Sequence, residues 1–103
     1  PDEAGHQGDV QAKVTALERI DEHIVKPLLD KLRTHDSWKI LIAPDHPTPV
    51  SRRVHTNAPP PFCLAGHGVP RVFNQPFSET TAAVGNLHID PGHELMEYFL
   101  KRR

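Results

Sequence analysis

Apolar residues recur every three or four positions between residues 10 and 28, and this spacing predicts a long amphipathic helix. The positions of this apolar stripe are Val10, Val14, Leu17, Ile20, Ile24 and Leu28. Asp9 stands where the helix needs an N-cap, and the polar, glycine-containing residues 1–9 are predicted to be a loop. Pro27 lies inside the pattern and lacks a backbone N–H, so we expect a kink there, with the helix continuing over 28–32.

Two short apolar runs farther along the chain predict strands. Residues 39–43 begin with Lys39 and continue as four apolar residues, a pattern typical of a strand covered on both faces. Residues 62–65 form a second run, which Gly66 ends. The segment 44–61 between them is rich in proline and is predicted to be a long loop.

The C-terminal third of the chain carries the signals of two short helices. Ser78 is a candidate N-cap for a helix through Val84. Pro91 is expected at the first position of a final helix that begins after Asp90. The residues expected on its inner side are Leu95, Met96, Phe99 and Leu100. The order of helix, strand, loop, strand and helix indicates the α/β fold class.

Composition narrows the classes of protein that fit. Twelve basic residues against thirteen acidic ones create no field that would attract nucleic acid or an anionic membrane. No apolar run approaches the roughly 20 residues needed to span a bilayer. Cys63 is the single cysteine, so no intrachain disulfide can form, and a reducing cytoplasm is the natural location.

The chain is expected to be one domain, or a piece of one, that packs against something else. Its apolar share of 37% is low for a self-sufficient core, and its eleven prolines imply much irregular backbone. It starts at Pro1 rather than at methionine, which we interpret as the mark of a fragment. The apolar stripe and the strand edges also favour self-association of such a fragment.

The candidate chemistry lies directly after the first predicted strand. Asp45 and His46 are adjacent there, and His55 follows nine residues after His46. Open α/β sheets place ligands at the carboxyl ends of their strands, and a set of Asp and His ligands without thiolate suits Mn²⁺ or Zn²⁺. Asp2 and His6 supply one more carboxylate and imidazole. The sequence therefore predicts a metal site.

Each of these residues also has a plainer interpretation. Asp45 and His46 can form an ordinary turn before Pro47, with the carboxylate accepting from nearby backbone. Asp2 and His6 can belong to a polar N-terminal tail. The remaining histidines are interpreted as solvated or capping residues; they are His23, His35, His67, His88 and His93. No glycine-rich phosphate loop, serine elbow or Cys/His pair is present.

Taken together, these segments resemble the archaeal-type cofactor-independent phosphoglycerate mutases, a branch of the alkaline phosphatase superfamily. The matching segments are Pro1-Asp2-Glu3-Ala4-Gly5-His6, Lys13, Ile20-Asp21, Pro44-Asp45-His46-Pro47-Thr48-Pro49, His55-Thr56, Pro59-Pro60-Pro61-Phe62 and Gly92-His93-Glu94-Leu95-Met96. The resemblance covers nearly all of this chain but corresponds to the C-terminal part of a protein several times longer. It implies that residues 1–103 form one C-terminal fragment of a three-layer α/β/α domain.

The resemblance also implies a site and a reaction. In such enzymes two divalent ions flank a Ser or Thr nucleophile; Mn²⁺ is favoured, with Zn²⁺, Mg²⁺ and Co²⁺ as alternatives. Asp2, His6 and His55 resemble the ligands of one ion, and Asp45 and His46 resemble ligands of the other. The nucleophile and the substrate-binding lobe would lie in the missing N-terminal part. The parent would interconvert 3- and 2-phosphoglycerate through a phosphoenzyme, whereas the fragment alone would be inactive.

Two alternatives stay open at the level of sequence. The parent can be another metal-dependent phosphotransferase or phosphatase of the same superfamily, because the part that would select the substrate lies outside this chain. The chain can also be a non-catalytic metal-binding module that functions alone. The upstream sequence in the natural gene discriminates between these interpretations.

Overall fold

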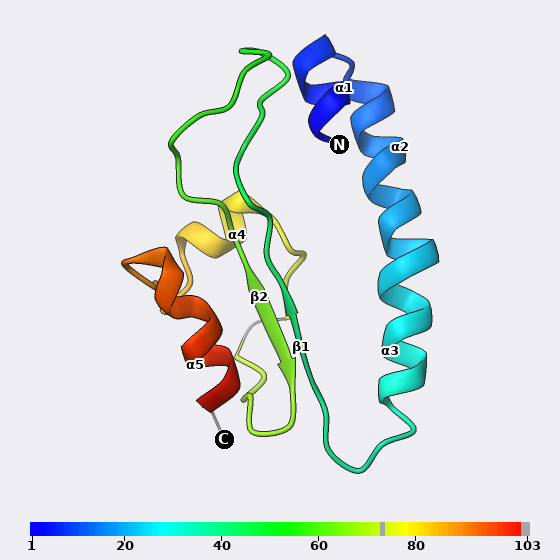
Figure 1. Cartoon of the computed structure of the whole chain (residues 1–103), viewed down its shortest axis with the longest axis vertical. Helices are drawn as coiled ribbons and strands as arrows, with labels where there is room; N and C mark the ends of the chain where they lie inside the picture. Colours follow the sequence, from blue (N-terminus) through cyan, green and yellow to red (C-terminus); the bar gives the residue numbers. More distant parts are fainter. Residues whose placement is uncertain (73, 102–103) are drawn as a thin grey trace. The chain divides into compact units, whose positions relative to one another are not determined.

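The computed structural model describes residues 1–72 and 74–101, which fall into two compact units. The first unit contains Pro1–Asp36 and Asp45–Pro60, and the second contains Ser37–Pro44 and the chain from Pro61 onward. Helices dominate the first unit, and a two-stranded sheet with short helices makes up the second (Figure 1). This mixture agrees with the expected α/β class.

The first unit begins with a helix where a loop was predicted. Helix α1 (Asp2–Gln7) has two acidic residues in its first turn, where they favourably oppose the helix dipole. Gly8 ends it in the left-handed conformation, at φ 70°, and the Asp9 N–H returns to the carbonyl of Ala4 at 2.9 Å. The prediction of a loop was wrong because Gly8 is a helix C-cap here, and tertiary contacts stabilise this short helix.

The long helix is present and extends over most of the expected span. Helix α2 (Val10–Ile20) is capped by Asp9, whose Oδ1 accepts from the Ala12 N–H at 2.9 Å. It continues through a π-helical turn, η1 (Asp21–Val25), into α3 (Lys26–Leu32). Pro27 lies in the first turn of α3, so its ring meets the preceding turn. The irregularity expected at Pro27 therefore occurs one turn earlier. There the Lys26 N–H donates to the carbonyl of Asp21, five residues before it.

The second unit is built on an antiparallel ribbon. Strand β1 (Lys39–Ile42) pairs with β2 (Cys63–Gly66), and Lys39 lies opposite Gly66. All four residues of β1 are half-buried, so the expectation of a strand covered on both faces is wrong for the described chain. Complete burial of a strand requires a layer on each face, and these four residues are only partly covered.

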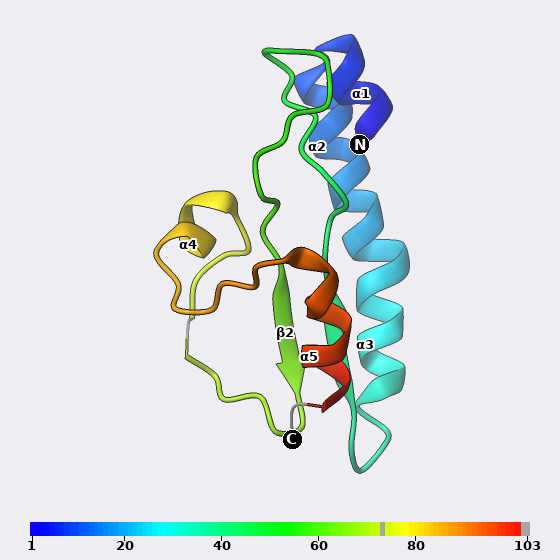
Figure 2. The same ribbon diagram turned by 60° about the vertical axis from the view of Figure 1, so that its left-hand side comes forward.

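Two short helices complete this unit. Ser78 caps α4 (Glu79–Ala83) through its side chain, as expected. The last helix starts later than predicted, because Pro91 precedes a 3-10 turn, η2 (Gly92–Glu94), that leads into α5 (Leu95–Lys101). The α5 helix lies beside the ribbon (Figure 2), where Lys39 donates to the carbonyl of Phe99 at 2.6 Å. Met96 and Leu100 are exposed rather than on an inner side.

Burial among the described residues is unusual. No hydrophobic residue of that part of the chain is buried, and the two buried residues are Gly5 and Thr48. Residues of the apolar stripe are exposed; Val10 and Ile24 each reach 58%. In the described ranges, no helix has the length and apolar character to cross a membrane. The most tightly enclosed point of the molecule thus lies in the first unit, between α1 and the loop 45–60.

Candidate metal centre

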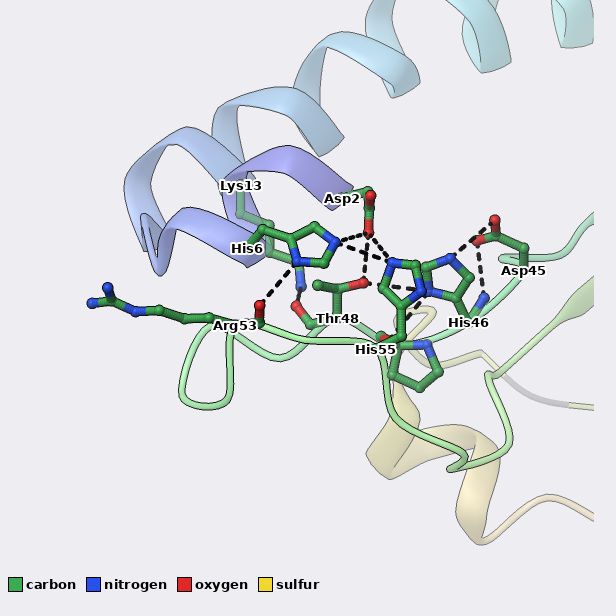
Figure 3. Close-up of polar contacts among 9 residues, drawn as sticks. Asp2, His6, Lys13, Asp45, His46, Thr48, Arg53 and His55 are labelled. Carbon is green, nitrogen blue, oxygen red and sulfur yellow. Dashed lines mark hydrogen bonds and ion pairs between the residues drawn. The ribbon is translucent and has the colours of Figure 1, made fainter.

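Helix α1 places Asp2 and His6 on one face, one turn apart. Residues four apart in a helix lie next to each other, and the Asp2 Oδ1 atom is 3.4 Å from Nε2 of His6. Both side chains are exposed. They point toward the loop 45–60 (Figure 3), which runs beside α1 (Figures 1 and 2).

The loop brings two further imidazoles to these residues (Figure 3). Nε2 of His55 lies 3.1 Å from Asp2 Oδ1 and 3.1 Å from Nε2 of His6. The ring of His46 lies over that of His55, with 3.7 Å between their centroids. Three imidazoles and one carboxylate therefore converge from two segments about 40 to 50 residues apart in sequence.

Three of these residues are placed so that one cation can contact all of them. Asp2, His46 and His55 each offer a ligand atom, and the three atoms lie within 4.8 Å of one another. Ligands of a zinc-like ion sit about 2.0–2.2 Å from it and therefore lie a few ångströms from one another, as these atoms do. Imidazole and carboxylate together suit borderline and hard divalent ions. The donor set thus fits a divalent metal.

His6 is held in one tautomer by the loop backbone. Its Nδ1 lies 2.9 Å from the carbonyl oxygen of Arg53, which can only accept, so Nδ1 carries the hydrogen. The lone pair of the neutral ring is then on Nε2, the atom that faces Asp2 and His55. Arg53 adopts a positive φ of 58° at this point, an uncommon conformation for a residue with a side chain. Its guanidinium group points away from the cluster (Figure 3).

Asp2 is held in its charged form. The Thr48 hydroxyl donates to Asp2 Oδ1 at 2.7 Å, and this bond is the main cause that lowers the pKa of the Asp2 carboxyl. Desolvation is the second largest cause and raises the pKa, whereas smaller effects of the nearby His6 and His55 lower it further. A carboxylate kept ionised by its neighbours is ready to bind a cation.

Asp45 lies at the edge of the cluster. Its Oδ1 accepts from the backbone N–H of His46 at 2.9 Å, the local turn that was the plainer interpretation of this residue. Its Oδ2 is 3.4 Å from Nε2 of His46, and its side chain is 86% exposed. The structure therefore groups His46 with Asp2 and His55, and it connects Asp45 to this group through His46.

Sequence reasoning overlooked the residues that support this cluster. Thr48 contacts Asp2 directly, and the Lys13 ammonium group of α2 donates to the Thr48 carbonyl at 2.6 Å. The position of Thr48, a hydroxyl-bearing residue between Pro47 and Pro49, was the one feature of the sequence that could have indicated its supporting role. Lys13 carried no signal beyond its match to the family, because a lysine on a helix is ordinarily solvated.

In this site, histidines from a helix and a loop surround one carboxylate, and this arrangement is typical of metal-binding proteins. The chain belongs to the Metalloenzyme superfamily, whose family profile matches residues 1–102. This membership agrees with the donor set, which can hold a divalent ion.

Individual relatives give a finer comparison. The chain is 40% identical over 97% of its length to a 2,3-bisphosphoglycerate-independent phosphoglycerate mutase of Methanothrix thermoacetophila. It is 42% identical over 97% of its length to phosphoglycerate mutase 2 of that type from Methanothermobacter thermautotrophicus, and 38% identical over 99% to a probable one from Geobacter sulfurreducens. The chain spans about a quarter of the length of these relatives. No solved structure matches the chain significantly.

Proposed function

We propose that this chain supplies metal ligands to a phosphoglycerate mutase, an enzyme that interconverts 3- and 2-phosphoglycerate through a phosphoenzyme. The observation that carries the proposal is the clustering of Asp2, His46 and His55, whose ligand atoms lie within 4.8 Å of one another. The names of the relatives and the superfamily membership support the choice of reaction. The corresponding cellular role is cytoplasmic glycolysis and gluconeogenesis.

The proposed centre holds two divalent ions, with Mn²⁺ favoured over Zn²⁺, Mg²⁺ and Co²⁺. Asp2, His6 and His55 would hold one ion, and Asp45 and His46 would contribute to the other. The 3.7 Å between the ring centroids of His46 and His55 supports two adjacent ions, because each ring can serve a different one. Bound divalent ions supply positive charge that neutralises the oxygens of a transferring phosphoryl group.

The residues of this chain prepare that site in two ways. Thr48 donates a hydrogen bond to the Asp2 carboxylate, and the Arg53 carbonyl selects the tautomer of His6, before any ion arrives. The hydrogen bonds also hold the side chains in place, which limits the ordering cost of binding. Imidazoles must be neutral to bind a metal, so acid is expected to disable the site.

The rest of the proposed enzyme would lie outside these residues. We place residues 1–103 in the C-terminal part of a single three-layer α/β/α domain, with the nucleophile and the substrate-binding groups elsewhere in the polypeptide. Coverage of about a quarter of the relatives supports this placement. The exposed apolar stripe of α2 and α3 gives such a remainder a surface to pack on.

The test assays the gene product at its natural length with 3-phosphoglycerate and Mn²⁺. A mutase yields 2-phosphoglycerate and no inorganic phosphate, and this activity should disappear in His55→Ala but persist in the surface variant His93→Ala. Release of inorganic phosphate instead would support the phosphatase alternative. Residues 1–103 alone should show no turnover; turnover by this segment would contradict the proposed location of the nucleophile.

A further inference from the structure

We propose that Thr48 is a positioning residue of the metal centre, whose single hydroxyl orients two ligands, Asp2 and His46, at once. This inference rests on the proposed function, because it assigns a role within the same site. It concerns a side chain that binds no ion itself.

The Thr48 hydroxyl donates to Asp2. Oγ1 of Thr48 is 2.7 Å from Asp2 Oδ1, and an ionised carboxylate can only accept, so the hydroxyl hydrogen points to Asp2. This bond fixes one carboxylate oxygen in direction. The lone pairs of the Thr48 hydroxyl oxygen remain free to accept a second hydrogen bond.

His46 lies on the accepting side of that hydroxyl. Nδ1 of His46 is 3.3 Å from Thr48 Oγ1 and 3.3 Å from the carbonyl oxygen of Pro47. The carbonyl accepts only, and the hydroxyl has already given its hydrogen to Asp2. Both hydrogen bonds of Nδ1 require a hydrogen on that atom, which leaves the lone pair of neutral His46 on Nε2, the atom 3.4 Å from Asp45 Oδ2. A relay runs from His46 through Thr48 to Asp2.

The position of the hydroxyl is itself fixed from three sides. Thr48 is 4% exposed, and its carbonyl accepts from Lys13 at 2.6 Å. A Cβ on Gly5 would stand 3.0 Å from the γ-methyl carbon of Thr48, so α1 closes over the methyl side. Pro47 and Pro49 restrict the backbone on either side. These contacts hold the Thr48 side chain beside Asp2 and His46.

Loss of the Thr48 hydroxyl should weaken metal binding as much as loss of any other hydrogen-bond partner of a metal ligand. Removal of such a partner typically weakens metal binding by about 10- to 100-fold. Two variants separate the hydroxyl from the methyl group. Thr48→Val replaces the hydroxyl by a methyl group of similar size, and Thr48→Ser keeps the hydroxyl and removes the methyl group.

The experiment titrates Co²⁺ into the metal-free, natural-length protein and its two variants, with visible absorption as the readout. We expect Thr48→Val to bind Co²⁺ about 10- to 100-fold more weakly, with a changed spectrum, and Thr48→Ser to resemble the wild type. Equal affinity and spectrum in Thr48→Val would overturn the inference. A loss shared equally by Thr48→Ser would also overturn it, because packing would then be the cause.

A second measurement needs no variant. Long-range ¹H–¹⁵N NMR of the histidine-labelled, metal-free protein reports the tautomer of His46, which should carry its hydrogen on Nδ1. Hydrogen on Nε2 would contradict the relay even if Thr48→Val failed to fold. If the wild type bound no Co²⁺, the proposed function would fall and this inference with it. If only the role of Thr48 were wrong, the wild type would still bind Co²⁺.

Discussion

Gly5 in α1 and Thr48 in the loop are in direct contact, and they are the two buried residues of the described chain. A Cβ atom on Gly5 would overlap the carbonyl oxygen of Thr48. The glycine therefore allows the loop to approach the helix closely enough for the Thr48 hydroxyl to reach Asp2. Close approach at this point couples the packing of α1 to the geometry of the candidate ligands.

Substitution Gly5→Ala should destabilise the protein, although the same change inside an exposed helix usually stabilises it. We expect a loss of about 1–3 kcal/mol in the free energy of unfolding, because the added methyl group meets rigid backbone. Urea denaturation followed by circular dichroism measures it. Gly92→Ala is the matched control, since a Cβ there meets nothing within 4 Å. Unchanged or increased stability of Gly5→Ala would contradict the close contact.

Removal of the Lys13 ammonium group should loosen the loop. In Lys13→Met the Thr48 carbonyl loses a half-buried charged donor at 2.6 Å, and we expect about 1.5–3 kcal/mol of destabilisation. The apolar stem of lysine is largely retained by methionine, so the measured change reports the hydrogen bond. Lys31→Met on the exposed side of α3 serves as the reference. Equal unfolding midpoints for the two variants would show that Lys13 does not support the loop.

Removal of the imidazole of His55 should abolish most of the divalent-metal affinity. Its Nε2 is within 3.1 Å of both Asp2 and His6, so His55→Ala removes a central candidate ligand. We expect calorimetric titration with Mn²⁺ and Zn²⁺ to show a fall of more than about 100-fold, which exceeds the loss of a ligand's hydrogen-bond partner. His93→Ala, a change on the exposed η2 turn, should bind as the wild type does. Comparable losses in both variants would indicate nonspecific binding by surface histidines.

The metal-free protein should show a carboxyl at Asp2 with a lowered pKa. The native pKa lies below the unfolded value of about 3.9, so the stabilisation is present above that pH and is lost as pH falls through the native pKa. In Thr48→Val the largest cause of the shift is gone, and the pKa should rise toward its ordinary value. Carboxyl ¹³C NMR titration measures both proteins. Identical titration curves would exclude the hydroxyl as the cause.

Cys63 in β2 should react slowly with alkylating reagents. Its burial raises the pKa of the thiol, against a weaker opposite effect of its backbone contact with Ile42, so less thiolate is present at any given pH. As pH rises above the ordinary thiol value of about 8.5, ionisation should favour the unfolded state. Iodoacetamide labelling in buffer and in urea gives the comparison. Equal rates in the two conditions would show that the thiol is not shielded.

Local sequence signals were sufficient for the elements whose causes lie within a few residues. The apolar periodicity of residues 10–28 predicted the long helix, and the side-chain caps Asp9 and Ser78 accept hydrogen bonds from residues three positions on. Helix α1 was missed because its stability depends on Gly8 as a C-cap and on the contact between Gly5 and Thr48. A six-residue segment with an internal glycine is otherwise a poor helix former.

The sequence by itself determined which residues are suited to hold a metal and which family the chain resembles. Their grouping was decided by the tertiary structure, which sets His46 beside Asp2 and His55 and leaves Asp45 at the edge. It also decided the role of Thr48, whose bond to Asp2 joins residues 46 positions apart. Short-range hydrogen bonds follow from neighbouring residues, whereas long-range contacts depend on how the loop closes onto α1, and local patterns carry no record of that closure.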